Sequence, residues 1–253
     1  MSRSRWFAPR GALALVAIVV LVVACGPDHR AVLSKAQDRL STARHGWIDF
    51  QITSASSGGA VTGVRLSGTY RLRRQHRLPT VDLTYVNAVA GAETRAVRVR
   101  ITGDSVFTGP PAQLRELTPT EAASLRLPSS GHAPLLDLEF ARWMTDPRSA
   151  DRPHGETIAS GGVDGAALLR NIVPLIVQIS GDHELPAPSR AALNAVQRRV
   201  IASRMDVITR ADGSVDRLSA LVQFSPGHLQ ALRAVLGAYA GAELAVGLRF
   251  RHR

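Results

Sequence analysis

Residues 97–108 read Val-Arg-Val-Arg-Ile-Thr-Gly-Asp-Ser-Val-Phe-Thr. Every second side chain from Val97 to Ile101 is apolar and the others are polar, which is the pattern of a strand buried on one face. The Gly103-Asp104 pair predicts a tight turn into a second strand. This stretch therefore predicts an antiparallel hairpin with one wet side.

The same alternation continues on both sides of this hairpin. Residues 48–108 predict an antiparallel meander of about five strands. Further strands are expected at residues 156–163, 201–209, 215–224 and 244–250. Ala211-Asp-Gly213 predicts a hairpin turn between the second and third of these.

Apolar residues at helical spacing predict the remaining elements. Helices are expected at residues 29–44, 120–125, 135–144, 164–174, 188–199 and 225–240. Asp164 and Ser225 are candidate N-caps, and Pro174 is expected to kink or end its helix. The order of elements predicts an α+β fold with one large antiparallel sheet and helices packed on one face.

The N-terminus carries a separate pattern. Residues 22–25 read Val-Val-Ala-Cys, and Cys25 is the single cysteine of the chain. Arginines precede the apolar run 11–24, which as a helix would span roughly 21 Å, short of a ~30 Å hydrocarbon core. The pattern resembles the lipobox of bacterial prolipoproteins, in which the cysteine is acylated. An uncleaved signal anchor is the alternative.

The lipobox resemblance implies how the chain is divided and where it resides. We expect residues 1–24 to be a signal peptide, residues 25–28 an acylated, palmitate-bearing tether, and residues 29–253 a single domain. The mature protein would be held on the extracytoplasmic face of the cell membrane by its acyl chains.

The charge of the chain is strongly positive, at +11. Because an exported lipoprotein meets no nucleic acid, we expect attraction to anionic lipid head groups instead. Arginines are concentrated in two neighbouring parts of the predicted meander. One predicted hairpin contains Arg65, Arg71, Arg73, Arg74 and Arg77, and the neighbouring strand contains Arg95, Arg98 and Arg100. We interpret Arg71, Arg73 and Arg74 as a basic patch at the membrane surface; the alternative is an ordinary solvated sheet face.

Catalytic and metal-binding motifs are missing from the sequence. There is no His-Glu-x-x-His and no Gly-x-Ser-x-Gly. His154 and His183 stand near acids, which in loops are usually solvated turn residues. We therefore predict that the protein is not an enzyme and needs no metal or other cofactor. An acid within reach of either histidine in a cleft would favour a hydrolase.

Several segments together resemble a known family. They are Trp47-Ile-Asp-Phe-Gln-Ile, Leu66-Ser-Gly-Thr-Tyr, Val99-Arg-Ile-Thr-Gly-Asp-Ser-Val-Phe and the step from Gly162 to Pro174. With the lipobox, they resemble the actinobacterial LppX/LprG lipoproteins, whose fold is that of the carrier LolA. The resemblance implies a half-barrel: a strongly curved antiparallel sheet with helices on its concave face. It also implies an apolar cavity that carries lipids or lipoprotein acyl chains.

The apolar strand faces are the candidate lining of such a cavity. The candidates are Phe50, Leu66, Tyr70, Leu83, Val99, Met205, Val207, Leu218, Val222 and Leu248. The ligand would be a lipid, a glycolipid or another apolar molecule, which the protein binds or transports. The alternative is a core filled by these side chains, in a structural or regulatory lipoprotein that binds an envelope protein partner.

Overall fold

The computed structural model describes residues 28–56, 58–72, 79–89, 92–124, 138–180, 187–225 and 229–251 of the 253-residue chain. Cys25, the expected signal peptide, Arg73, Arg74, Arg77 and His183 lie outside these ranges.

The described elements comprise helices, strands and short 3-10 turns. The helices are α2 (His29–Ser41), α3 (Pro119–Ser124), α4 (Gly165–Ser180), α5 (Arg190–Gln197) and α6 (Leu229–Leu236). The 3-10 turns are η2 (Phe140–Arg142), η3 (Pro153–Gly155) and η4 (Gly237–Tyr239). The strands are β1 (His45–Ala55), β2 (Val61–Arg71), β3 (Thr80–Ala88), β4 (Arg95–Thr102), β5 (Ser105–Gly109), β6 (Arg115–Glu116), β7 (Met144–Asp151), β8 (Thr157–Val163), β9 (Val200–Thr209), β10 (Val215–Phe224) and β11 (Glu243–Arg251).

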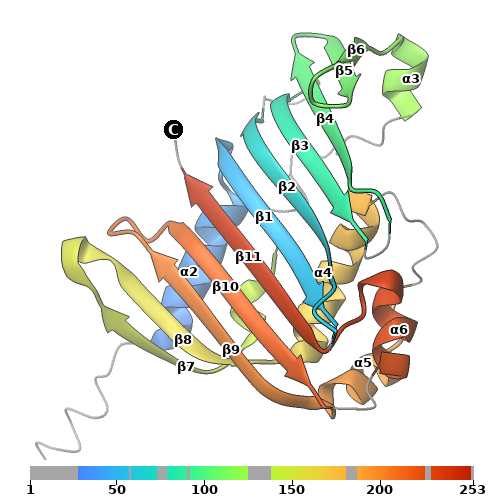
Figure 1. Cartoon of the computed structure of the whole chain (residues 1–253). Helices are drawn as coiled ribbons and strands as arrows, with labels where there is room; N and C mark the ends of the chain where they lie inside the picture. Colours follow the sequence, from blue (N-terminus) through green and yellow to red (C-terminus); the bar gives the residue numbers. More distant parts are fainter. Residues whose placement is uncertain are drawn as a thin grey trace, which may run out of the picture.

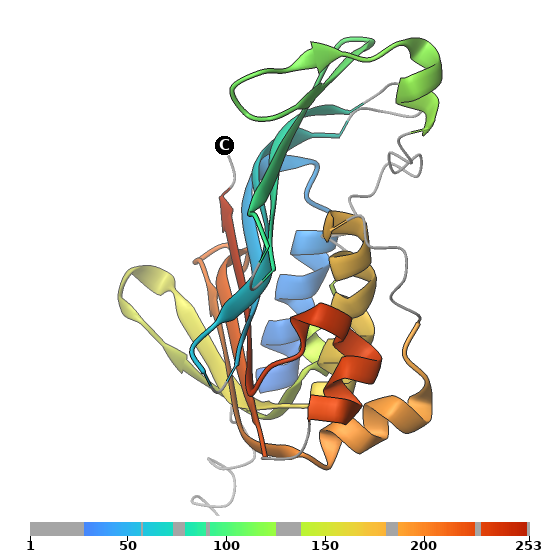
Figure 2. The same cartoon turned by 45° about the vertical axis from the view of Figure 1, so that its right-hand side comes forward.

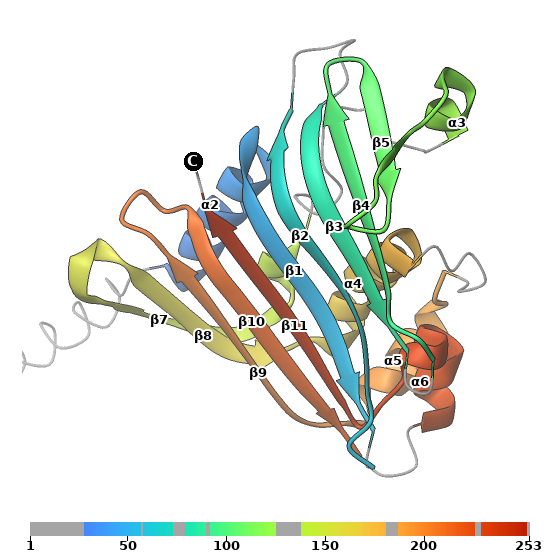
Figure 3. The same ribbon diagram turned by 45° about the horizontal axis from the view of Figure 1, so that its top comes forward.

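All eleven strands form one sheet, in the order β6-β5-β4-β3-β2-β1-β11-β10-β9-β8-β7 (Figure 1). Every pairing is antiparallel, and the first and last strands, β1 and β11, pair at its centre. The sheet is long, curved and unclosed (Figure 3). Helices α2, α4, α5 and α6 lie on one side, which we call the concave face; the other is the outer face (Figure 2). The predicted α+β half-barrel is confirmed.

The predicted alternation explains the core. In β1 the even-numbered residues from Gly46 to Ser54 are buried and the odd-numbered ones are more exposed. β10 and β11 alternate in the same way. Because the side chains of a strand alternate between faces, one set packs under the helices and the other meets solvent.

The first helix is fixed by its cap and its apolar stripe. The Asp28 carboxylate accepts hydrogen bonds from the backbone N–H groups of Arg30 and Ala31, which are free at a helix start. Leu33, Ala36 and Leu40 are buried against the sheet. The helix packs on β7, β8 and β10, so its amphipathic pattern is satisfied by the sheet.

One predicted helix differs from the structure. The helix expected at residues 135–144 is, in its described part, the short turn η2 followed by strand β7. Because β7 is an edge strand, it tolerates Pro147 and a polar sequence without alternation. Of the two outcomes expected at Pro174, a kink or a helix end, the second does not occur, since α4 continues to Ser180. Pro174 lies on the exposed side of α4, where water can satisfy the carbonyl that loses its donor.

Candidate ligand-binding face

One row of side chains crosses most of the concave face. Residues directly opposite one another in an antiparallel sheet point to the same side. The row runs through Val97, Tyr85, Leu66, Phe50, Leu248, Leu218, Val207 and Ala159. It is apolar throughout, apart from the tyrosine hydroxyl.

Burial along this row falls towards β4. Phe50 is fully buried, Tyr85 is half-buried, and Val97 is 43% exposed. The cause is the placement of the helices: α4 packs on β2 and β3, whereas β4 and β5 extend past the helices (Figure 2). The concave face is therefore a closed core in its middle and an open apolar surface at β3 and β4.

A second row beside the first has a gap in its side chains. It passes from Ile48 over Gly68 to Leu83 and Val99. Gly68 has φ 146°, and a Cβ atom there would overlap the backbone carbonyl of Asp82. Leu83 and Val99 are half-buried, so this row also becomes accessible on β3 and β4.

Polar groups border this open surface at one end. The buried Tyr239 donates a hydrogen bond of 2.9 Å to Asn87 Oδ1, and Asn87 lies opposite the exposed Arg95. The register places Arg95 on the concave face, away from the outward Arg98 and Arg100 with which the sequence groups it. The open surface is thus apolar along its length and polar at its rim.

The structure separates the ten predicted lining residues into two groups. Phe50, Leu66, Tyr70, Met205, Val207, Leu218, Val222 and Leu248 are buried in one continuous core cluster. Leu83 and Val99 are half-buried at the start of the open surface, and Leu83 also packs against that cluster. Tyr85 and Val97 share that surface and are missing from the predicted set. The sequence pattern could have identified them, because Tyr85 lies two residues from Leu83 and Val97 two residues from Val99, and residues two apart on a strand share a face.

Burial also sets the chemistry of the two tyrosines on this face. The Tyr70 hydroxyl donates to the carbonyl of Ala43 at 3.3 Å, and burial raises its pKa. Burial likewise raises the pKa of Tyr85. Both hydroxyls stay neutral at physiological pH, so they add no charge to the apolar face.

The outer face carries arginines, some of which are paired with acids. Asp82 accepts hydrogen bonds from Arg98 at 2.6 and 2.7 Å and from Arg100 at 3.1 and 3.2 Å. The hydrogen bonds from Arg98, with the charge of Arg100, hold the pKa of Asp82 below its usual value. Asp49 pairs with Arg65 in the same bidentate way.

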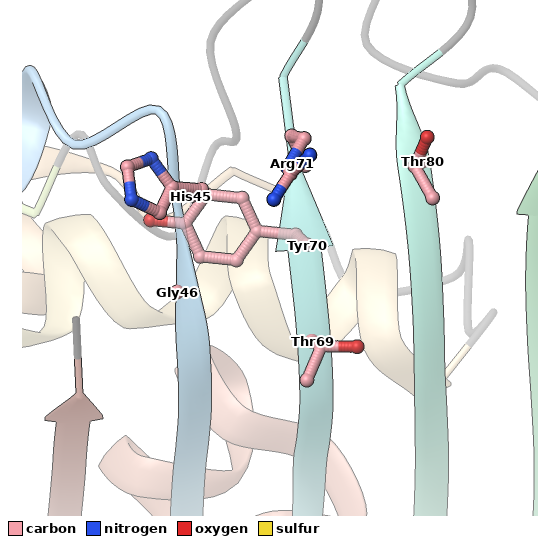
Figure 4. A pocket seen from close by; sticks show the side chains of 6 residues that line it. All are labelled: His45, Gly46, Thr69, Tyr70, Arg71 and Thr80. Atoms are coloured by element: carbon pink, nitrogen blue, oxygen red, sulfur yellow. The ribbon is translucent and has the colours of Figure 1, made fainter. Parts of the chain in front are cut away.

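Arg71 lies at the end of β2 beside a shallow hollow of about 290 Å³. The hollow is lined by His45, Gly46, Thr69, Tyr70, Arg71 and Thr80 from three neighbouring strands (Figure 4). Arg71 is exposed. Of the three arginines in the predicted membrane patch, it is the one that lies within the described ranges.

Within the described residues, no three His, Cys, Asp or Glu side chains come together as metal ligands. None of the helices in those ranges is both long and apolar enough to cross a bilayer. His154 is in turn η3 with a positive φ of 65°, and no hydrogen bond joins its side chain to an acid in the described part of the chain.

Comparisons with known proteins find likeness in structure and not in sequence. No family model and no curated protein matches the chain. LprF from Mycobacterium bovis matches with a TM-score of 0.43 and 10% identity, over 90% of this chain and 93% of that one. A LolA superfamily protein from Nitrosomonas europaea matches with a TM-score of 0.23 and 9% identity, over 88% and 91%. At these identities and TM-scores, neither match says what this chain does.

Proposed function

We propose that this protein is a lipid-anchored protein of the cell envelope that binds a lipid or another apolar molecule on the concave face of its sheet. The observation that carries the proposal is the apolar row that runs out of the core to Tyr85 and the 43% exposed Val97. An apolar surface that continues a core is costly to leave in water, at roughly 25 cal/mol per Å².

The chemistry of this surface favours an acyl chain over a polar ligand. Leu83, Tyr85, Val97 and Val99 offer contact area and no charge. A buried chain gains roughly 0.8 kcal/mol per CH₂. A chain of ordinary length therefore needs few polar contacts to bind, and Asn87 and Arg95 lie at the rim to meet a polar end.

The proposed anchor is Cys25, acylated after removal of residues 1–24. Its support is the lipobox pattern together with the position of α2. Because Asp28 already caps that helix, only two residues separate Cys25 from the fold. The domain would therefore be held close to the extracytoplasmic membrane surface.

A second candidate function follows from the buried part of the same face. Eight of the ten predicted lining residues pack in the core cluster. If this packing is the working state, the protein has a filled core and acts through a protein partner in the envelope. Both candidates are non-enzymatic.

Native mass spectrometry with lipid extraction separates the two. The sample is residues 25–253 with Cys25→Ser, which contains every described element, made in a host that supplies envelope lipids. We expect an adduct of one lipid class that Val97→Asp abolishes, because a carboxylate would be buried under the chain. Val61→Asp is the matched control, since Val61 is a 56% exposed valine on the outer face. A clean mass with no uptake of added lipid supports the partner-binding function.

A further inference from the structure

Four arginines on the outer face gather at the end of the sheet where β2 and β11 finish. Arg217 on β10 stands directly opposite Arg249 on β11, and Arg251 follows two residues later on the same side. Thr69 lies across β1 from Arg251, and Arg71 follows Thr69 by two residues on the same side. All four are exposed.

These arginines lack acidic partners in the part of the chain that the structure describes. Arg71, Arg217, Arg249 and Arg251 form no ion pair there. Asp49 is opposite Arg249, but both of its carboxylate oxygens accept from Arg65. The like charges of Arg217 and Arg249 directly oppose each other, an arrangement that destabilises an antiparallel pair unless an anion lies over it.

An aromatic side chain lies at the centre of this cluster. Trp47 is opposite Arg251, whose guanidinium lies 5.4 Å from the centre of the indole ring. Tryptophan is enriched at the level of lipid head groups, and guanidinium groups bind phosphate in a bidentate manner. An arginine cluster around a tryptophan has the chemistry of a membrane interface.

The hollow beside Arg71 adds a place for one head group. Its outward side chains, His45, Thr69, Arg71 and Thr80, supply hydroxyl and nitrogen groups around about 290 Å³ (Figure 4). The hollow adjoins Trp47, which is opposite Thr69. The hollow is shallow, and its lining is mixed, with these polar groups beside apolar surface.

The position of the tether allows this face to reach the membrane. His29 Nδ1, at the start of α2, lies 2.6 Å from Ser149 Oγ on the edge strand β7. Strand β10 is three strands away, about 14 Å at the usual strand spacing. The three residue steps from Cys25 to Asp28, which caps α2, span up to about 11 Å when extended. Arg217 is thus roughly one tether length from the anchored edge of the sheet, so one membrane can hold the acyl anchor and contact Arg217 and its neighbours.

We propose that Trp47, Arg71, Arg217, Arg249 and Arg251 form a docking surface for an anionic lipid membrane, with a phosphate-bearing head group in the hollow beside Arg71. This goes beyond ligand binding on the concave face, and it is built mainly from strands far from the arginine-rich hairpin in sequence. Docking would fix the orientation of the anchored domain on the membrane.

The test measures partition onto vesicles of residues 25–253 with Cys25→Ser. We expect binding to vesicles that contain phosphatidylglycerol, little binding to phosphatidylcholine alone, and weaker binding in high salt. The variant Arg71→Gln/Arg217→Gln/Arg249→Gln should partition about 100-fold less, at about fivefold per charge. Its thermal midpoint should stay the same or rise, because Arg217 and Arg249 repel each other.

The matched control removes the same charge elsewhere. Arg170→Gln/Arg190→Gln/Arg233→Gln neutralises three exposed arginines on helices α4, α5 and α6. We expect it to partition within a few-fold of the parent. Equal losses in the two triple variants, or no loss in the first, would overturn the docking surface and favour an acidic protein as its partner. Val97→Asp should partition normally, so failure of ligand binding remains separate from failure of docking.

Discussion

Alanine substitutions at the two ends of one cross-strand row test where the core ends and the ligand surface begins. Phe50 is 0% exposed at the centre of the sheet, and replacing a core phenylalanine by alanine costs about 3–5 kcal/mol. Val97→Ala removes two carbons worth about 0.8 kcal/mol each when fully buried. Because Val97 is 43% exposed, its loss should cost roughly 1 kcal/mol.

The assay is urea unfolding followed by fluorescence, with the slope of the transition checked against the parent. A domain of ordinary stability, about 5–15 kcal/mol, should stay folded with either change. The reasoning is refuted if Phe50→Ala costs 1 kcal/mol or less, because the centre of the sheet would then be an open slot. It is equally refuted if Val97→Ala costs as much as Phe50→Ala, because β4 would then be covered.

Three further predictions concern single sites. Asp82→Asn should lower the free energy of unfolding by about 1 kcal/mol near neutral pH, since the pair is only partly buried. The folded-state pKa of Asp82 is depressed, so this difference should be present above about pH 4 and vanish as pH falls further, as measured by unfolding across pH. Gly68→Ala should cost more than 2 kcal/mol in the same assay, because its Cβ would overlap β3, whereas Gly103→Ala in an open turn should cost about 1 kcal/mol. Cys25→Ser in the full chain should abolish incorporation of labelled palmitate; unchanged labelling would rule out this residue as the anchor.

Much of the architecture could be predicted from period-two alternation. The strand at 215–224 was predicted with its observed bounds, and the predicted cap Asp164 lies where a polar residue precedes an apolar helical run. Asp164 accepts from Ala167 N–H at 3.0 Å, as expected of an N-cap. Strand alternation and helix caps depend on residues only a few positions apart, so they can be predicted from the sequence.

Long-range pairing could not be predicted in the same way. The contact of β1 with β11 joins residues about 200 apart, and no local pattern encodes it. That pairing is what turns a meander and a hairpin into one sheet. It also brings Arg251 beside Trp47 and Arg249 beside Asp49. The arginine cluster of the outer face therefore could not be predicted from local sequence patterns.

Edge strand β7 was missed for a related reason. Its sequence, Met-Thr-Asp-Pro-Arg-Ser-Ala-Asp, has no apolar alternation. It becomes a strand because β8 offers it hydrogen-bond partners, with a register shift between Thr145 and Arg148 near Pro147. The extent of the open surface was likewise unpredictable, because it depends on which strands α4 packs against.

The most direct test of the central claim is to locate a bound acyl chain. A fatty acid that carries a photoreactive diazirine would be added to residues 25–253 with Cys25→Ser, irradiated, and its attachment sites mapped by peptide mass spectrometry. Binding on the concave face predicts attachment within β3 and β4, around Tyr85 and Val97, with competition by unlabelled lipid. Attachment confined to the outer face around Val61 and Leu221, or no competed attachment at all, would contradict it.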